Sequence, residues 1–371
     1  MTTGDVEVLG TDDGHRPRRI GPTIVAGVLI VGAVAVLATR GTTHHHAAPT
    51  PIVPHPAPTV PLVSAVPTDL PPESVGRVGD IAVVLGHTAH TPSYGTITTL
   101  DGPSAFSPVT NEINDGVALA VAGTGTTAWL AVKHTIRDAG GPASIEGVDL
   151  RGQVGLIGAE LPAVPHSIAV VGGKVWVGLD GRVAEYDPTT QQLRLHRVTP
   201  GAIVDLVADP DGRHLYGAVS DGANIVRWRL PGLVEEVART VPSGMHVTHL
   251  AYWHGSLWAS AVDESLTVGR VLHIAADNLS DEEGGPPAHD GPVQAVYAGT
   301  AELWLLDAGH RQLRCLRPTT TGVRIGAPTG LQPLEPADAS TDLLVAVGDR
   351  VYVDVQNGPV TYVASVVCPA T

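Results

Sequence analysis

Short apolar runs, separated by turn-forming residues, follow one another through most of the chain, from residue 73 to residue 371. The segments 174–179 and 350–355 show an apolar alternation that is typical of half-buried β-strands. Continuous apolar runs lie between such segments, as at 116–123 and 292–299, and favour strands that are buried on both faces. The pattern predicts an all-β domain of many short strands.

These strands recur as a repeat, which consists of a turn, a short run with Trp or Tyr, and a second run that ends near Asp. The clearest copies are 172–198 and 209–232. Counting back from the first aromatic residue reaches Val83, in a copy that lacks the aromatic. The aromatic residues follow one another at intervals of 40 to 48 residues, at Trp129, Trp176, Tyr216, Trp258, Trp304 and Tyr352.

A period of about 40–50 residues with several short strands per copy is typical of β-propeller blades. One small sheet cannot bury both of its faces, whereas sheets stacked around an axis bury them mutually. The number of copies predicts a seven-bladed β-propeller. Six blades are the alternative, because the first copy lacks a clear inner strand and the last copy lacks a clear outer one. The two ends of the domain could share one blade and so close the ring.

Two stretches carry a resemblance to known proteins, ADPDGRHLYGAVSDGANIVRWRL (208–230) and VWVGLDGRVAEYDPTT (175–190). In both, a strand, an Asp-Gly turn, an aromatic strand and an Asp residue follow one another. The pattern resembles the repeats of bacterial YVTN-type and virginiamycin-B-lyase-like β-propellers. The resemblance implies the architecture of the repeat domain and no particular activity, because propellers carry many functions.

A separate apolar segment precedes the repeats. Residues 20–39 contain no charged side chain and, as a helix, would be about 30 Å long, enough to cross a bilayer. Three Arg residues precede this segment (Arg16, Arg18 and Arg19) and one follows it (Arg40), so we expect the N-terminus in the cytoplasm and the rest of the chain outside. The alternative is a cleaved signal peptide, with a small-residue site near Ala38.

The sequence therefore predicts four parts: a cytoplasmic tail (1–19), a transmembrane helix (20–39), a Pro/Thr/Ala-rich disordered linker (40–72) and an extracytoplasmic propeller (73–371). Localisation in a cell membrane as a single-pass protein follows from this order. The linker composition favours an extended chain without a core of its own. Composition rich in Ala, Gly, Pro and Val and nearly free of Lys is typical of an actinobacterial protein.

Charge and cysteine content narrow the function classes. A net charge of −15 without a basic run argues against nucleic acid as a partner. The only two cysteines, Cys315 and Cys368, could form one disulfide or be two buried small residues, and they exclude a Cys-based zinc site. The sequence holds no Ser nucleophile elbow, HExxH helix, phosphate loop or dinucleotide fingerprint, and we expect no cofactor and no metal.

Candidate ligand-binding residues come from aligning the predicted inner strands, whose ends form the mouth of a propeller channel. The alignment places His166, Thr248, Gln294 and Asp342 at one level, and Asp205 and His249 one step further along. Histidine beside a carboxylate can exchange protons near neutral pH, and such a group can also hold a polar ligand.

We expect a membrane-anchored propeller that acts as a binding or scaffolding module for a protein or a cell-envelope ligand. The alternative is an extracytoplasmic hydrolase or lyase that uses His166, His249 and either Asp205 or Asp342 at the channel mouth. The two hypotheses differ in whether these side chains converge on one reacting group.

Overall fold

A computed structural model gives the fold. It describes residues 6–9, 59–60, 63–67, 72–87, 95–100, 111–113, 116–134, 143–151, 154–220, 224–265, 268–282, 289–290, 293–299, 301–307, 312–319, 322–326, 328–331, 341–347, 350–355, 360–365 and 368. All of them belong to one compact unit, formed by residues 1–10 and 57–371. None of the described residues forms a helix with the length and apolar character needed to span a bilayer, and the predicted segment 20–39 lies outside them.

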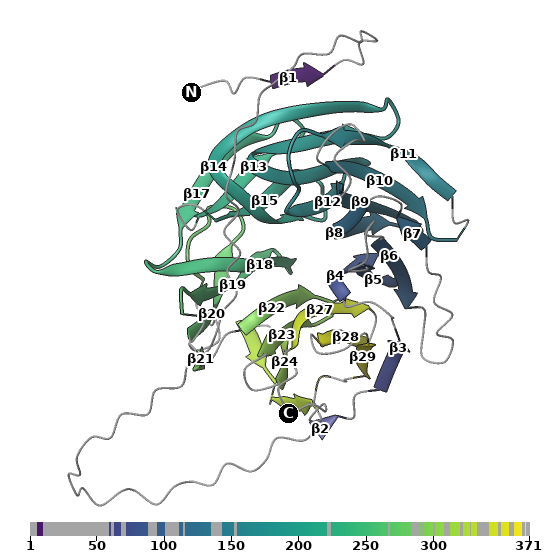
Figure 1. The fold of residues 1–371 in the computed structure, drawn as a ribbon. Helices are drawn as coiled ribbons and strands as arrows, with labels where there is room; N and C mark the ends of the chain where they lie inside the picture. Colours follow the sequence, from purple (N-terminus) through teal and green to yellow (C-terminus); the bar gives the residue numbers. More distant parts are fainter. Residues whose placement is uncertain are drawn as a thin grey trace, which may run out of the picture. The chain divides into compact units, whose positions relative to one another are not determined.

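One sheet of eight strands begins the domain, in the order β11-β10-β9-β8-β4-β5-β6-β7 (Figure 1). Its two antiparallel halves, β4 to β7 and β8 to β11, meet at a single parallel pair, Val78 with Gly123. The sheet is therefore two four-stranded groups joined at their inner strands. Its members are β4 (Pro72–Val78), β5 (Ile81–His87), β6 (Gly95–Leu100), β7 (Asn111–Ile113), β8 (Gly116–Thr124), β9 (Thr127–His134), β10 (Ala143–Asp149) and β11 (Val154–Leu161).

A second sheet, β12-β13-β14-β15-β16-β17, also joins two groups, because its long strands each serve two neighbours. The first residues of β13 (Lys174–Asp187) pair with β12 and the last ones pair with β14. Likewise, β14 (Gln192–Ala208) pairs first with β13 and then with β15. The other members are β12 (Ser167–Val171), β15 (His214–Val219), β16 (Asn224–Arg229), β17 (Val234–Thr240) and β1 (Val6–Leu9), which pairs antiparallel with residues 193–196 of β14.

Three smaller sheets complete the domain (Figure 1). The first consists of β18 (Met245–Trp253), β19 (Ser256–Asp263), β20 (Val268–Ala275) and β21 (His289–Asp290). The second consists of β22 (Val293–Ala298), β23 (Leu303–Asp307), β24 (Gln312–Thr319), β25 (Gly322–Ile325), β26 (Thr329–Leu331) and β2 (Thr59–Val60). The third consists of β27 (Thr341–Val347), β28 (Arg350–Val355), β29 (Val360–Ser365) and β3 (Val63–Pro67). The domain is thus an all-β propeller, as the repeat predicts.

The inner strands of these groups follow one another in space. In the order β4, β8, β12, the second part of β14, β18, β22 and β27, each strand contacts the next, and β27 contacts β4. On the second strand of each group, a large residue pairs with the inner strand at an equivalent register; Trp258, for example, pairs with Ala251. The corresponding pairs are Val83 with Gly76, Trp129 with Ala122, Trp176 with Ala169, Tyr216 with Val207, Trp304 with Tyr297, and Tyr352 with Val345.

The last sheet combines the two ends of the domain. Strand β3 pairs antiparallel with β29, so a segment from before the repeats is the outermost strand of the C-terminal group. A segment near the start of the compact unit and the C-terminal strands therefore share one sheet. Strands β2 and β3 lie within the range 40–72 that was expected to be linker, and both belong to the compact unit, which begins at Ala57. The Pro-rich composition concealed these strands, since edge strands tolerate Pro where central strands do not.

A disulfide between Cys315 and Cys368 ties the C-terminal end of the chain to β24, with the two Cα atoms 5.7 Å apart. Both cysteines are buried. Around the bridge, Gly326 N donates to the Cys315 carbonyl at 2.7 Å and Arg317 Nη2 donates to the Cys368 carbonyl at 3.0 Å. The bridge therefore connects the group of β22 to β26 with the segment that follows β29.

Candidate functional site

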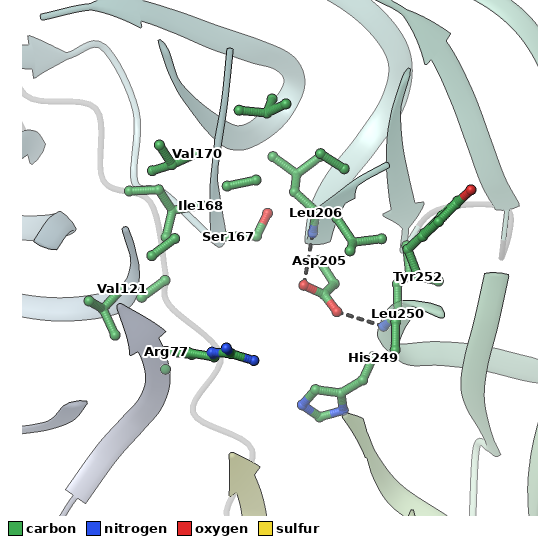
Figure 2. A pocket seen from close by; sticks show the side chains of 18 of the residues that line it. Arg77, Val121, Ser167, Ile168, Val170, Asp205, Leu206, His249, Leu250 and Tyr252 are labelled. Carbon is green, nitrogen blue, oxygen red and sulfur yellow. Dashed lines mark hydrogen bonds between the residues drawn. The ribbon is translucent and has the colours of Figure 1, made fainter. Parts of the chain in front are cut away.

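A cavity of about 850 Å³ lies between the inner strands and is lined by residues of β4, β8, β12, β14, β18 and β22 (Figure 2). Its volume is typical of pockets that hold small ligands. Much of its wall is apolar, with side chains such as Val121, Ile168 and Leu250. Polar side chains reach it from several different inner strands or their ends, and they define the candidate site.

The residues that the alignment placed together at the channel mouth occupy equivalent positions on their strands, and most of these positions lie at a β-bulge. Six of the seven inner strands carry a β-bulge, and each bulge includes the position three residues before the partner of the large second-strand residue. A bulge changes the direction of the side chain next to it. Thr248, Gln294 and Asp342 lie at three of these bulges, and His166 precedes β12 at the equivalent position.

The other positions at this level are Glu73, Leu119 and Val204, which the sequence alignment did not single out. Asp205 and His249 directly follow their bulges, so the structure also reproduces the expected one-step offset. The side chains of Gln294 and Asp342 lie outside the described residues.

Asp205 is the most perturbed acid of the cavity. Its carboxylate accepts hydrogen bonds from the backbone N–H groups of Leu206, at 2.8 Å, and Leu250, at 2.7 Å. Burial raises the pKa of Asp205 to about 7, although the two amide bonds act in the opposite direction. A carboxyl group that titrates near neutral pH in a cavity is a candidate for function. The bond to Leu250 also links β14 to β18.

Arg77 brings a positive charge to the same cavity and was not predicted. It lies on β4, and in Figure 2 its guanidinium points into the space that Asp205 and His249 also face. Its Nε donates to the Gly79 carbonyl at 2.6 Å, and its Nη2 lies 3.4 Å from a carboxylate oxygen of the well-exposed Asp80. These contacts use only part of a guanidinium, which has five N–H groups.

Arg77 and Asp205 have opposite effects on the pKa of Tyr297. Burial raises the pKa of its hydroxyl; the positive charge of Arg77 opposes this change and the carboxylate of Asp205 adds to it. Both charges therefore contribute to the electrostatic environment of Tyr297. Tyr297 is also the inner-strand partner of Trp304, so its backbone position is fixed by the repeat.

Two of the predicted residues make contacts away from this set. His166 Nε2 lies 2.9 Å from Asp180 Oδ1, at an exposed end of the cavity. The hydroxyl of Thr248 lies 2.7 Å from the Ser260 hydroxyl on the neighbouring strand. In the part of the chain that the structure describes, no three His, Cys, Asp or Glu side chains gather closely enough to hold a metal ion.

No known protein family model matches the chain, and no curated protein matches its sequence. Solved structures do match its fold. A catalytically inactive virginiamycin B lyase from Staphylococcus aureus, solved with quinupristin, has a TM-score of 0.58 at 14% identity, over 82% of this chain and 98% of that chain. The WD40 domain of Toxoplasma gondii coronin has a TM-score of 0.61 at 12% identity, over 85% and 90%.

The Pan2 WD40 domain of Neurospora crassa also has a TM-score of 0.61, at 9% identity, over 84% of this chain and 95% of that chain. At such low identities these similarities establish the fold alone. The resemblance to virginiamycin-B-lyase-like propellers therefore holds at the level of architecture.

Proposed function

We propose that this protein is a binding module, a seven-bladed propeller that a membrane helix holds outside the cytoplasm and that receives a protein or cell-envelope ligand at its central cavity. The cavity carries this proposal, because it combines a ligand-sized volume, a partly apolar wall and polar groups from several strands. Arg77, Asp205 and His249 are among the polar side chains that line it (Figure 2).

Seven blades are supported by the repeated register. Seven inner strands follow one another in contact, and each has the same spacing between its mouth position and the partner of the large second-strand residue. A six-bladed reading would have to leave out either the group of β4 or the group of β27, and both groups show this register.

If the cavity binds a ligand, a photo-crosslinking amino acid placed in the cavity should capture that ligand covalently, and one placed elsewhere on the protein should not. A photo-crosslinking amino acid in place of Leu119, which lines the cavity at the mouth level, is expected to form discrete adducts in intact cells. The same amino acid in place of Val234, which is 48% exposed on strand β17, serves as the matched control. Intact-mass spectrometry of the purified protein detects adducts of any size. Equal labelling at the two positions, or none at Leu119, would contradict the proposal.

The membrane anchor is supported by the uncharged segment 20–39 and by the Arg residues before it. The buried disulfide agrees with a location outside the cytoplasm, since such bonds persist in oxidising compartments. One contact opposes this arrangement. Strand β1 pairs with β14, which requires residues 6–9 and the propeller to be on the same side of any membrane.

Two engineered cysteines distinguish the arrangements. Val8 lies opposite Arg194 in the β1–β14 pair, and both native cysteines are already bonded to each other. In membranes that contain the Val8→Cys/Arg194→Cys protein, we expect no new disulfide on oxidation. A membrane-impermeant maleimide should label the Arg194→Cys variant in intact cells and the Val8→Cys variant only after permeabilisation. An efficient Val8→Cys/Arg194→Cys disulfide would overturn the anchored topology and leave the binding proposal in place.

A further inference from the structure

The cavity contains opposite charges on inner strands that are not neighbours. Asp205 lies on β14 and Arg77 lies on β4, and along the contact order β8 and β12 separate these two strands. In Figure 2 the two side chains extend into the cavity from different sides. Both charges contribute to the electrostatic environment of Tyr297, which also lines the cavity. A bound molecule could reach both charges.

Each charge retains bonding capacity toward the cavity. The Asp205 carboxylate accepts two backbone N–H bonds, whereas an ionised carboxylate offers about four acceptor sites. For Arg77, the bonds to Gly79 and Asp80 involve Nε and Nη2, and among the described residues Nη1 has no hydrogen-bond partner. Asp209, the other acid on the cavity wall, is already committed, because its carboxylate accepts bonds from the backbone and the ring of His214 and from the Arg213 backbone.

Part of the cavity wall is apolar. Ile168, Leu206, Leu250 and Val296 line the cavity and are themselves mostly buried. Such a surface suits hydrocarbon, and a charge that is partly shielded from water interacts more strongly than it does in bulk water. The arrangement is therefore complementary to a molecule with a charged group at each end and an apolar segment between them.

We infer that the cavity binds a small dipolar molecule, whose cationic nitrogen contacts Asp205 and whose anionic group contacts Arg77. This inference rests on the proposed binding function and specifies its ligand class. A zwitterion with a short hydrocarbon spacer, such as an ω-amino acid, is the simplest member of that class.

Titration calorimetry of the purified full chain with unbranched ω-amino acids of increasing length tests the ligand class. We expect affinity to pass through a maximum at one chain length. The alkylamine and the fatty acid of that same length each lack one charge. Each is expected to bind about tenfold more weakly or worse, since a charged hydrogen bond is lost.

Two variants test which charged end of the ligand contacts Arg77 and which contacts Asp205. Arg77→Gln should abolish the advantage of the ω-amino acid over the alkylamine, and Asp205→Asn should abolish its advantage over the fatty acid. Asp211→Asn and Arg213→Gln change an exposed ion pair and are the matched controls, with affinities unchanged. Binding of the alkylamine that equals binding of the ω-amino acid would overturn the assignment of Arg77.

The outcomes separate this inference from the function on which it rests. If adducts form at Leu119 but no ω-amino acid binds at millimolar concentration, the dipolar ligand is overturned and the binding module stands. If neither experiment gives a signal, both are overturned. If ω-amino acids bind but Asp205→Asn and Arg77→Gln bind them as tightly as the original chain, the ligand lies elsewhere and the inference fails.

Discussion

Removal of the Cys315–Cys368 disulfide is expected to lower the free energy of unfolding by about 4 kcal/mol. The bridge joins residues 53 apart in the sequence, and a crosslink restricts the unfolded chain more when it closes a longer loop. Folded proteins are commonly stable by only about 5–15 kcal/mol, so a loss of this size would bring the chain close to unfolding at physiological temperature.

The measurement compares urea unfolding, followed by Trp fluorescence, of the oxidised chain and of the Cys315→Ala/Cys368→Ala variant. Alanine avoids placing a buried hydroxyl beside Gly326. Each single variant should be destabilised by a similar amount, because either change removes the whole bridge. Reductant should shift the unfolding midpoint of the original chain but not that of the double variant. Equal midpoints for the oxidised chain and the double variant would show that the bridge contributes nothing to stability.

The repeat could be predicted because its signals are local. Trp176 and Trp258 occupy the same position in two different copies of the repeat. Both are almost fully buried, and each pairs with an alanine of the inner strand. Since the mouth position lies at a constant distance from that partner, alignment of the inner strands was sufficient to place Thr248 and Gln294 at the same level. The fold class and the common level of these residues therefore followed from local sequence patterns and their spacing.

The rest depends on contacts that spacing does not encode. Arg77 lies in the copy without an aromatic residue, where Val83 takes that position, so the alignment had no reference there. Arg77 is the single charged residue of the segment 74–79, and this was the signal that could have been followed. Strand β3 was missed because its pairing with β29 joins opposite ends of the domain. The bond between the Asp205 carboxylate and Leu250 N–H likewise connects neighbouring groups and has no sequence pattern.

Asp205→Asn is expected to remove a pH dependence of stability. Burial raises the pKa of Asp205 from 3.8 to about 7 in the folded protein. The folded state therefore holds the proton more tightly than the unfolded state, so the stability from this group is complete below about pH 4 and is lost as the pH rises to about 7. Three pH units at about 1.4 kcal/mol each correspond to a loss of up to about 4 kcal/mol.

Asparagine resembles the protonated acid at every pH, so the variant should lack this slope. Relative to the original chain, it should gain up to about 4 kcal/mol of stability between pH 4 and pH 8, measured by urea unfolding. Asp211→Asn, at an exposed position, is the control and should change stability by less than about 0.5 kcal/mol throughout. Parallel pH profiles for Asp205→Asn and the original chain would show that the carboxyl group is not desolvated.

The same substitution connects stability with binding. The ionised carboxylate destabilises the fold above neutral pH because it is held away from water, and that condition also makes it a strong partner for a cationic nitrogen. A dipolar ligand should therefore stabilise the original chain most at pH 8, where Asp205 is ionised, and little at pH 5. In the Asp205→Asn variant this ligand-induced stabilisation should be weak at both pH values, although the unliganded variant is the more stable protein at pH 8. Opposite changes in stability and affinity from one substitution are expected where a buried charge serves binding and not folding.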